Sequence, residues 1–152
     1  MRRRMLLQGG AVAAFAWAAV PAVVQAQGMA PTIDAPAAKG LVDAGGVLVD
    51  VRTPRELREN GRPAGSTHIP LQGDDLTFNL DFVKQLLAAT GGDKTRPVAL
   101  ICSGSRRSAH AARVLAGQGF TQVFSVGEGI FGSNLGPGWS ARGLPMEPCP
   151  AC

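Results

Sequence analysis

The sequence of 152 residues has few aromatic side chains, few charged ones and few cysteines. Aromatic residues make up 5% of the chain, too few for a surface that stacks nucleic-acid bases. Charged residues make up 17% and hydrophobic residues 45%, so the chain is too apolar for the disordered class and is expected to fold around a core. It has no Gly-X-Y period and no long internal repeat, which excludes collagen and solenoids, and its length fits about one domain.

The net charge of +4 is concentrated at the N-terminus. Three arginines at positions 2–4 precede a mostly apolar stretch that ends in Val24-Gln25-Ala26. This layout is typical of a secretory signal peptide, and we predict cleavage after residue 26. Residues 1–26 hold three of the 15 basic residues and no acidic one, which leaves a net charge of +1 on residues 27–152. We therefore predict a periplasmic or secreted protein that does not bind nucleic acid.

An uncleaved membrane anchor is the alternative for residues 1–26. Their apolar stretch is short and mostly alanine, and Gln8 and Pro21 weaken a span of about 20 residues. The start also resembles the twin-arginine export pattern without the usual Ser or Thr ahead of the pair, so the export route stays open. No cysteine near residue 26 supports a lipoprotein anchor. We expect no stable membrane association after cleavage.

The rest of the chain predicts alternating strands and helices. Residues 27–36, with Gly, Pro and Thr, are predicted to form a flexible linker before a domain at 37–148. Runs of β-branched and apolar residues predict three buried strands, at Val47–Val51, Pro97–Cys102 and Gln122–Val126. Apolar spacings followed by glycine predict helices at 37–44, around 82–90 and at 108–117. This order predicts an α/β fold, a parallel sheet flanked by helices.

Cys102 ends the second predicted strand, at the sheet edge where α/β folds bind ligands. Small residues in the following loop let successive backbone N–H groups form an anion-binding nest, and the next helix adds positive partial charge there. Both effects favour the thiolate, which is the nucleophilic form of cysteine. The alternative is a buried structural cysteine beside a loop that only caps a helix. The loop residues are Ser103, Gly104, Ser105, Arg106, Arg107 and Ser108.

Three segments in order, at 49–57, 102–108 and 119–123, resemble the opening signature, the active loop and the following strand entry of the rhodanese family. The similarity runs from Val47 to Pro145. It implies a single rhodanese-like domain, a persulfide on Cys102, and a loop whose backbone amides hold the transferred sulfur.

Two departures from the family pattern leave the donor open. Gly61-Arg62-Pro63 replaces the usual Gly-His-Ile, and Ser103 follows the cysteine where arginine is common.

The loop length bears on the reaction. Four residues separate Cys102 from Arg107, whereas the related dual-specificity phosphatases have five, so this loop is sized for a sulfur atom. We therefore predict an exported sulfurtransferase that needs no cofactor. It would move a sulfane sulfur from a small sulfur-containing anion such as thiosulfate, or from a persulfide donor, to a thiol or cyanide. The alternatives are a persulfide-binding or redox-sensing module without turnover and, third, a cysteine-dependent phosphatase.

Several polar residues have two interpretations. Arg107 is expected to orient the loop or the anionic donor, while Arg106 fits that role or a solvated face equally well. Asp50 and Arg52 either support the loop or, the interpretation we favour, close a strand and cap the next helix. Glu56 follows Arg52 at helical spacing and is expected to pair with it.

His68 and His110 have no spacing that indicates catalysis, and neither is needed to activate the thiol. Residues 127–130, with Gly132, are candidates for a second wall of the site.

Cys149 and Cys152 form a C-x-x-C tail at 149–152. Such a pair is redox-active, metal-binding or a simple disulfide. With two histidines in the chain and Cys102 committed elsewhere, the ligands for a closed zinc site are lacking, so we predict no metal. In an oxidising compartment we expect a disulfide that leaves Cys102 as the free thiol. A sulfur-accepting role for the pair is a further hypothesis.

Overall fold

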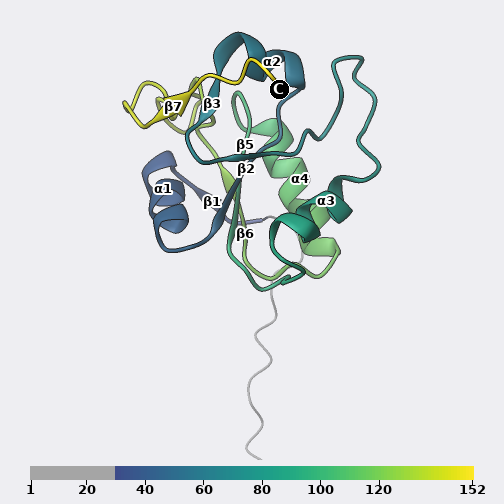
Figure 1. The fold of residues 1–152 in the computed structure, drawn as a ribbon. Helices are drawn as coiled ribbons and strands as arrows, with labels where there is room; N and C mark the ends of the chain where they lie inside the picture. The colour runs from purple at the N-terminus through teal and green to yellow at the C-terminus, as the bar shows by residue number, and fades with distance from the viewer. Residues whose placement is uncertain (1–29) are drawn as a thin grey trace, which may run out of the picture.

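The protein is described by a computed structural model, which covers residues 30–152 (Figure 1). Its centre is a five-stranded sheet in the order β1-β6-β5-β2-β4, in which all neighbouring strands are parallel. Short strands β3 and β7 form a separate antiparallel pair. The strands are β1 (Thr32–Ile33), β2 (Val47–Asp50), β3 (Arg62–Pro63), β4 (Thr67–His68), β5 (Val98–Ile101), β6 (Val123–Val126) and β7 (Met146–Glu147).

Helices cover both faces of the sheet, with α3 and α4 on one face and α1 on the other (Figure 1). The helices are α1 (Ala35–Asp43), α2 (Pro54–Asn60), α3 (Phe82–Ala89) and α4 (Arg106–Gly117). The parallel sheet flanked by helices confirms the predicted α/β fold. The predicted strands are β2, β5 and β6, each shorter than predicted by one or two residues at its ends.

Strand β5 shows why the central runs are continuously apolar. Successive side chains point to opposite faces, so Val98 and Leu100 pack toward α3 and α4 while Ala99 and Ile101 pack toward α1. All four are fully buried. The same alternation places Cys102 on the α4 face, directly after the last residue of the strand.

The prediction of a flexible linker at 27–36 is wrong for residues 30–36. Strand β1 adds to the edge of the sheet by pairing with β6. Helix α1 begins at Ala35, because Asp34 caps it by accepting a hydrogen bond from the Ala37 N–H at 2.8 Å. The predicted signal peptide and residues 27–29 lie outside the described residues. Within residues 30–152, no helix is long and apolar enough to cross a membrane.

Helix α2 starts at the carboxyl end of β2 and carries a capping box. Thr53 accepts a hydrogen bond from the Glu56 N–H, and the Glu56 carboxylate accepts one from the Thr53 N–H. Pro54 at the first helical position has no N–H to leave unpaired. The cap is therefore Thr53, and Asp50 and Arg52 do not provide it.

Asp50 and Arg52 instead form an ion pair with both side chains fully buried. Arg52 Nη2 donates to Asp50 Oδ2 at 2.7 Å and to the Gly61 carbonyl at 2.7 Å. The pair therefore closes β2 and holds the far end of α2. Its place at the end of the strand agrees with the first half of the interpretation that we favoured, that the pair closes a strand, whereas the second half, that it caps the next helix, is wrong.

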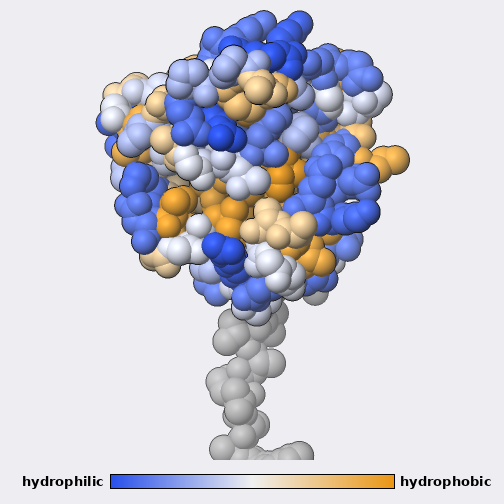
Figure 2. Space-filling view, viewed as in Figure 1, coloured by the Kyte–Doolittle hydropathy of each residue, from blue (hydrophilic) through white to orange (hydrophobic). Residues whose placement is uncertain are grey.

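The loop between β4 and α3 displays three large apolar side chains to solvent. Leu76, Phe78 and Leu80 are 67%, 64% and 96% exposed. Figure 2 shows hydrophobic surface protruding at the right-hand edge, where this loop lies in Figure 1. Asp74 ties the loop to α2 by accepting hydrogen bonds from the Arg55 N–H and from Arg58 Nη2, both at 2.9 Å.

Removing the buried Asp50 carboxylate should destabilise the fold strongly. Asp50→Asn leaves the Arg52 guanidinium buried without its counter-charge, and we expect the free energy of unfolding to fall by about 3–5 kcal/mol. Asp43→Asn is the matched control, since its carboxylate pairs with Lys39 on the exposed side of α1 and should contribute less than about 1 kcal/mol. Urea unfolding measures both, and equal losses would contradict this account of the buried pair.

Candidate active site

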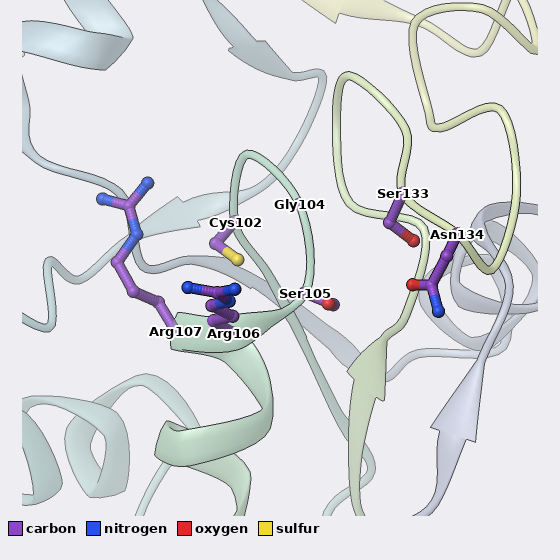
Figure 3. Close-up of a pocket in the computed structure, with 7 residues that line it drawn as sticks. All are labelled: Cys102, Gly104, Ser105, Arg106, Arg107, Ser133 and Asn134. Atoms are coloured by element: carbon purple, nitrogen blue, oxygen red, sulfur yellow. The ribbon is translucent and has the colours of Figure 1, made fainter.

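Cys102 lies between the end of β5 and the start of α4, in the short loop that joins them (Figure 3). Its side chain is nearly buried, with 2% of the residue exposed, yet it lines a cavity of about 410 Å³. Its sulfur points toward the start of α4. The structure thus brings the predicted loop together around the cysteine and adds a wall from a distant segment. The other lining residues are Gly104, Ser105, Arg106, Arg107, Ser133 and Asn134.

The backbone N–H groups of this loop are unpaired. In the part of the chain that the structure describes, the N–H groups of residues 103–108 donate to no backbone carbonyl. The first N–H groups of any helix lack partners within the helix and carry positive partial charge. Here the Ser105 side chain does not cap them either. The loop is therefore a group of free donors at the start of α4, where an anion is favoured.

Two buried hydroxyl groups continue this polar environment behind the sulfur. Cys102 Sγ lies 3.5 Å from Ser108 Oγ, which donates to the Ser105 carbonyl at 3.0 Å. Ser125 Oγ, on β6, donates to Ser108 Oγ at 3.0 Å. Sequence reasoning included Ser108 in the loop but missed Ser125. The signal for Ser125 is one serine within an otherwise apolar strand.

Glu56 connects α2 to the loop. Its carboxylate accepts hydrogen bonds from Ser103 Oγ at 2.6 Å and from Arg107 Nη1 and Nη2 at 2.6 and 2.7 Å. Burial raises the pKa of Glu56, but the hydrogen bonds from Arg107, Ser103 and the Thr53 N–H outweigh it and lower the pKa to about 2. The carboxylate is thus ionised near neutral pH and fixes one side of the loop.

This arrangement corrects the sequence-based pairing of Glu56 with Arg52. Arg52 is buried against Asp50, while Glu56 reaches across to Arg107. Arg107 consequently points away from Cys102 in Figure 3. Its contacts are those of a residue that orients the loop, one of the two roles predicted for it. Arg106, in contrast, is exposed at the rim of the cavity.

The turn after β6, at the segment that we proposed as a second wall, packs against the loop backbone, while the cavity itself is lined by Ser133 and Asn134 just beyond it. The N–H groups of Ile130 and Phe131 donate to the carbonyls of Cys102 and Ser103 at 2.9 and 3.0 Å. Gly129 has a positive φ of 63° and lies so close to Gly104 that a Cβ atom would collide with the Gly104 carbonyl. The loop carbonyls are therefore bound from this side, while the loop N–H groups stay free.

A buried carboxylate anchors the second wall. Glu128 accepts hydrogen bonds from the Ala35 N–H at 2.6 Å, the Gly138 N–H at 3.0 Å and Arg142 Nε at 2.8 Å. Burial raises the pKa of Glu128, and these hydrogen bonds outweigh burial and lower it overall. Glu128 thus joins the start of α1 to the loop that carries Ser133 and Asn134. Ala35 lies 93 residues away in the sequence, so the motif alone gave no sign that Glu128 joins these two segments.

The remaining candidates lie apart from the cavity lining. His68 Nε2 is 2.9 Å from the Arg52 carbonyl, and His110 is exposed on α4. Cys149 and Cys152 form a disulfide with a Cα–Cα distance of 5.4 Å, and Cys102 is a free cysteine. Among residues 30–152, no three His, Cys, Asp or Glu side chains are placed to hold a metal ion together.

Comparisons with known proteins agree with this arrangement. The family model for the rhodanese-like domain matches residues 34–133. The thiosulfate sulfurtransferase GlpE of Pseudomonas syringae pv. syringae (strain B728a) is 35% identical over 93 residues, which cover 61% of this chain and 76% of that protein.

Two solved structures share the fold. The crystal structure of Rv0390 from M. tuberculosis has a TM-score of 0.66 at 28% identity, covering 79% of this chain and 98% of that one. The polysulfide-sulfur transferase homodimer from Wolinella succinogenes has a TM-score of 0.57 at 25% identity, covering 80% and 81%.

Replacing the Glu56 carboxylate should loosen the loop that follows Cys102. Glu56→Gln should lower the free energy of unfolding at pH 7 by about 1–3 kcal/mol, because it leaves Arg107 without its ionic partner. Since folding lowers the pKa of Glu56 from 4.5 to about 2, its contribution is complete above pH 4.5 and is lost as the pH falls toward 2. The difference between wild type and variant in urea unfolding should therefore narrow over that interval.

Glu59→Gln is the control on the same helix. Glu59 pairs with Arg55 and its side chain is 61% exposed, so this variant should differ little from wild type at any pH. A pH-independent deficit for Glu56→Gln would contradict the assigned ion pair.

Gly129→Ala should distort the loop around Cys102. The new methyl group meets the Gly104 carbonyl, so we expect a larger loss of stability than a positive φ alone causes, together with a changed rate of Cys102 alkylation by iodoacetamide. Gly143→Ala separates the effect of the positive φ from that of the collision. Gly143 has a similar φ of 69° with no atom within 4 Å of an added Cβ, and should lose about 1 kcal/mol without any change in alkylation.

Proposed function

This chain belongs to the rhodanese-like domain family, and we propose that it is a sulfurtransferase that carries a sulfane sulfur as a persulfide on Cys102. The observation that supports this most is a free cysteine at the start of a helix, inside a loop whose six N–H groups, at residues 103–108, have no partner in the described part of the chain. A negatively charged sulfur on this cysteine would find hydrogen-bond donors already in place.

The reaction we propose has two half-reactions. The Cys102 thiolate attacks the outer sulfur of a donor such as thiosulfate, the sulfur–sulfur bond of the donor breaks, and sulfite leaves with the bonding electron pair. Cyanide or a thiolate then attacks the outer sulfur of the persulfide and restores the Cys102 thiolate. With cyanide the product is thiocyanate. A covalent intermediate divides one difficult transfer into two easier steps.

The loop supports the anionic sulfur in both states. Donors that are fixed before the reaction need no reorganisation, and each well-placed one contributes a few kcal/mol where water is excluded. The Ser108 hydroxyl, 3.5 Å from the sulfur, donates its proton to the Ser105 carbonyl, so it accepts from the neutral thiol and adds no donor for the anion. The cavity of about 410 Å³ leaves room above the cysteine for an added sulfur and for a small donor.

Arg106 is the residue we assign to the anionic end of the donor. Arg107 is occupied by Glu56, whereas Arg106 is exposed at the cavity rim. A guanidinium offers paired donors to an oxyanion such as the sulfonate end of thiosulfate.

We also propose that the protein acts in the periplasm or outside the cell. The basic and apolar pattern of residues 1–26 supports this location. A disulfide between Cys149 and Cys152 agrees with an oxidising compartment.

The central test is sulfur loading and transfer by the purified protein. After incubation with thiosulfate, Cys102 should gain the mass of one sulfur atom, about 32 Da. Transfer to cyanide should fall by at least about a thousandfold in Cys102→Ala, because the nucleophile is gone. A stable persulfide without multiple turnover would favour a binding module instead, and Cys102-dependent hydrolysis of an aryl phosphate would favour a phosphatase.

Arg106→Gln should weaken donor binding more than chemistry. We expect KM for thiosulfate to rise about tenfold with little change in kcat. Arg113→Gln is the matched control, since Arg113 is exposed seven residues further along α4, on the same side of the helix but two turns from the cavity. Initial rates over a range of thiosulfate concentrations measure both, and similar KM values for the two variants would contradict the role of Arg106.

A further inference from the structure

We propose that Cys149 and Cys152, when reduced, are a built-in dithiol acceptor that takes the sulfur from Cys102 of the same chain and releases it as hydrosulfide. This inference rests on the proposed function, because it requires a persulfide on Cys102. The site would then have a sulfur acceptor within its own chain in addition to any external acceptor.

The disulfide does little for the fold. The stabilisation that a disulfide provides grows with the length of the loop it closes. This one joins residues three apart in sequence, so it closes a very short loop and connects no separate elements of the domain. Pro150 and Ala151 between the cysteines are exposed, which leaves the disulfide open to reduction.

The tail, residues 148–152, follows strand β7, which anchors the chain just before the cysteines. Strand β7 pairs with β3, and Arg62 Nε donates to Glu147 Oε1 at 2.7 Å. Among the described residues, no hydrogen bond joins residues 148–152 to the rest of the domain, and the turn bond from the Cys152 N–H to the Cys149 carbonyl is internal. Five residues reach at most about 17 Å when extended.

Helix α2 brings this anchor close to the active loop. At the end of α2, an added Cβ on Gly61 would lie 3.7 Å from Pro148 Cα. In the first turn of the same helix, Glu56 binds Ser103 and Arg107. Seven helical residues span about 10 Å. Pro148 and the active loop therefore contact opposite ends of the same short helix, whose length is less than the reach of the tail.

The transfer balances with the groups present in the reduced chain. One thiolate of the pair attacks the outer sulfur of the Cys102 persulfide, whose sulfur–sulfur bond breaks so that Cys102 leaves as a thiolate. The second cysteine, as its thiolate, then attacks the Sγ of the persulfidated one, the disulfide forms, and hydrosulfide leaves. The two cysteines lose two electrons and the sulfane sulfur gains them. An external dithiol reductant must reduce the pair again before the next cycle.

Single-turnover release of sulfide tests the proposal. The protein is reduced, freed of reductant and mixed with one equivalent of thiosulfate. The wild type should release sulfide and lose about 2 Da as the disulfide forms again. Once Cys102 is loaded, release should be first order, with a rate constant that does not depend on protein concentration. In Cys149→Ser/Cys152→Ser it should slow at least tenfold, with the added sulfur remaining on Cys102 by mass spectrometry.

Oxidised wild type is the matched control, because it differs from the reduced protein only in the two thiols and should also retain the sulfur. Sulfide release that is equal in wild type and double variant, or that depends on protein concentration, would overturn the proposal. Adding cyanide to wild type that has been treated with thiosulfate distinguishes the acceptor role of the tail from the proposed function. Thiocyanate without sulfide release would refute the acceptor role alone, whereas failure to load Cys102 would refute the proposed function.

Discussion

Within residues 30–152, the backbone N–H groups that follow Cys102 donate to no carbonyl, and the structure around them maintains this state. The carbonyls of Cys102 and Ser103 are bound by the turn after β6. The Ser103 hydroxyl and the Arg107 guanidinium are bound by Glu56. Among the described residues, the donors of this loop that remain without a partner are the backbone N–H groups of residues 103–108. Free N–H donors at the start of a helix favour an anionic ligand.

Two carboxylates hold the two walls of the cavity. Glu56 fixes the loop that follows Cys102 to α2, and Glu128 fixes the loop that carries Ser133 and Asn134 to the start of α1. Both carboxylates have pKa values lowered by their hydrogen bonds, so both are charged over the range where the protein would act. The cavity therefore lies between two walls, each anchored to a helix on the outside of the sheet. Such anchoring keeps donors in position before the reaction, where preorganisation matters most.

Sequence reasoning succeeded where the information is local. The central strands were predictable because each is a short apolar run buried on both faces, and Cys102 was identifiable because it ends one of them before a glycine-containing loop. Reasoning from the sequence failed where contacts are long-range. Glu56 lies next to Arg52 in helical spacing, but its partner Arg107 is 51 residues away.

Strand β1 was missed for a related reason. Two residues in a polar segment have no pattern of their own and become a strand only by pairing with β6. Which of two adjacent arginines turns toward the cavity depends on how α4 sits against α2, which no local motif records.

The most direct test of the central claim is the amide NMR spectrum of the protein before and after Cys102 takes up a sulfur. If the free N–H groups of residues 103–108 hold the persulfide, their proton resonances should move downfield and their exchange with solvent should slow, while the amide of Gly143 stays unchanged. Persulfide formation that leaves the resonances of residues 103–108 in place would contradict the account.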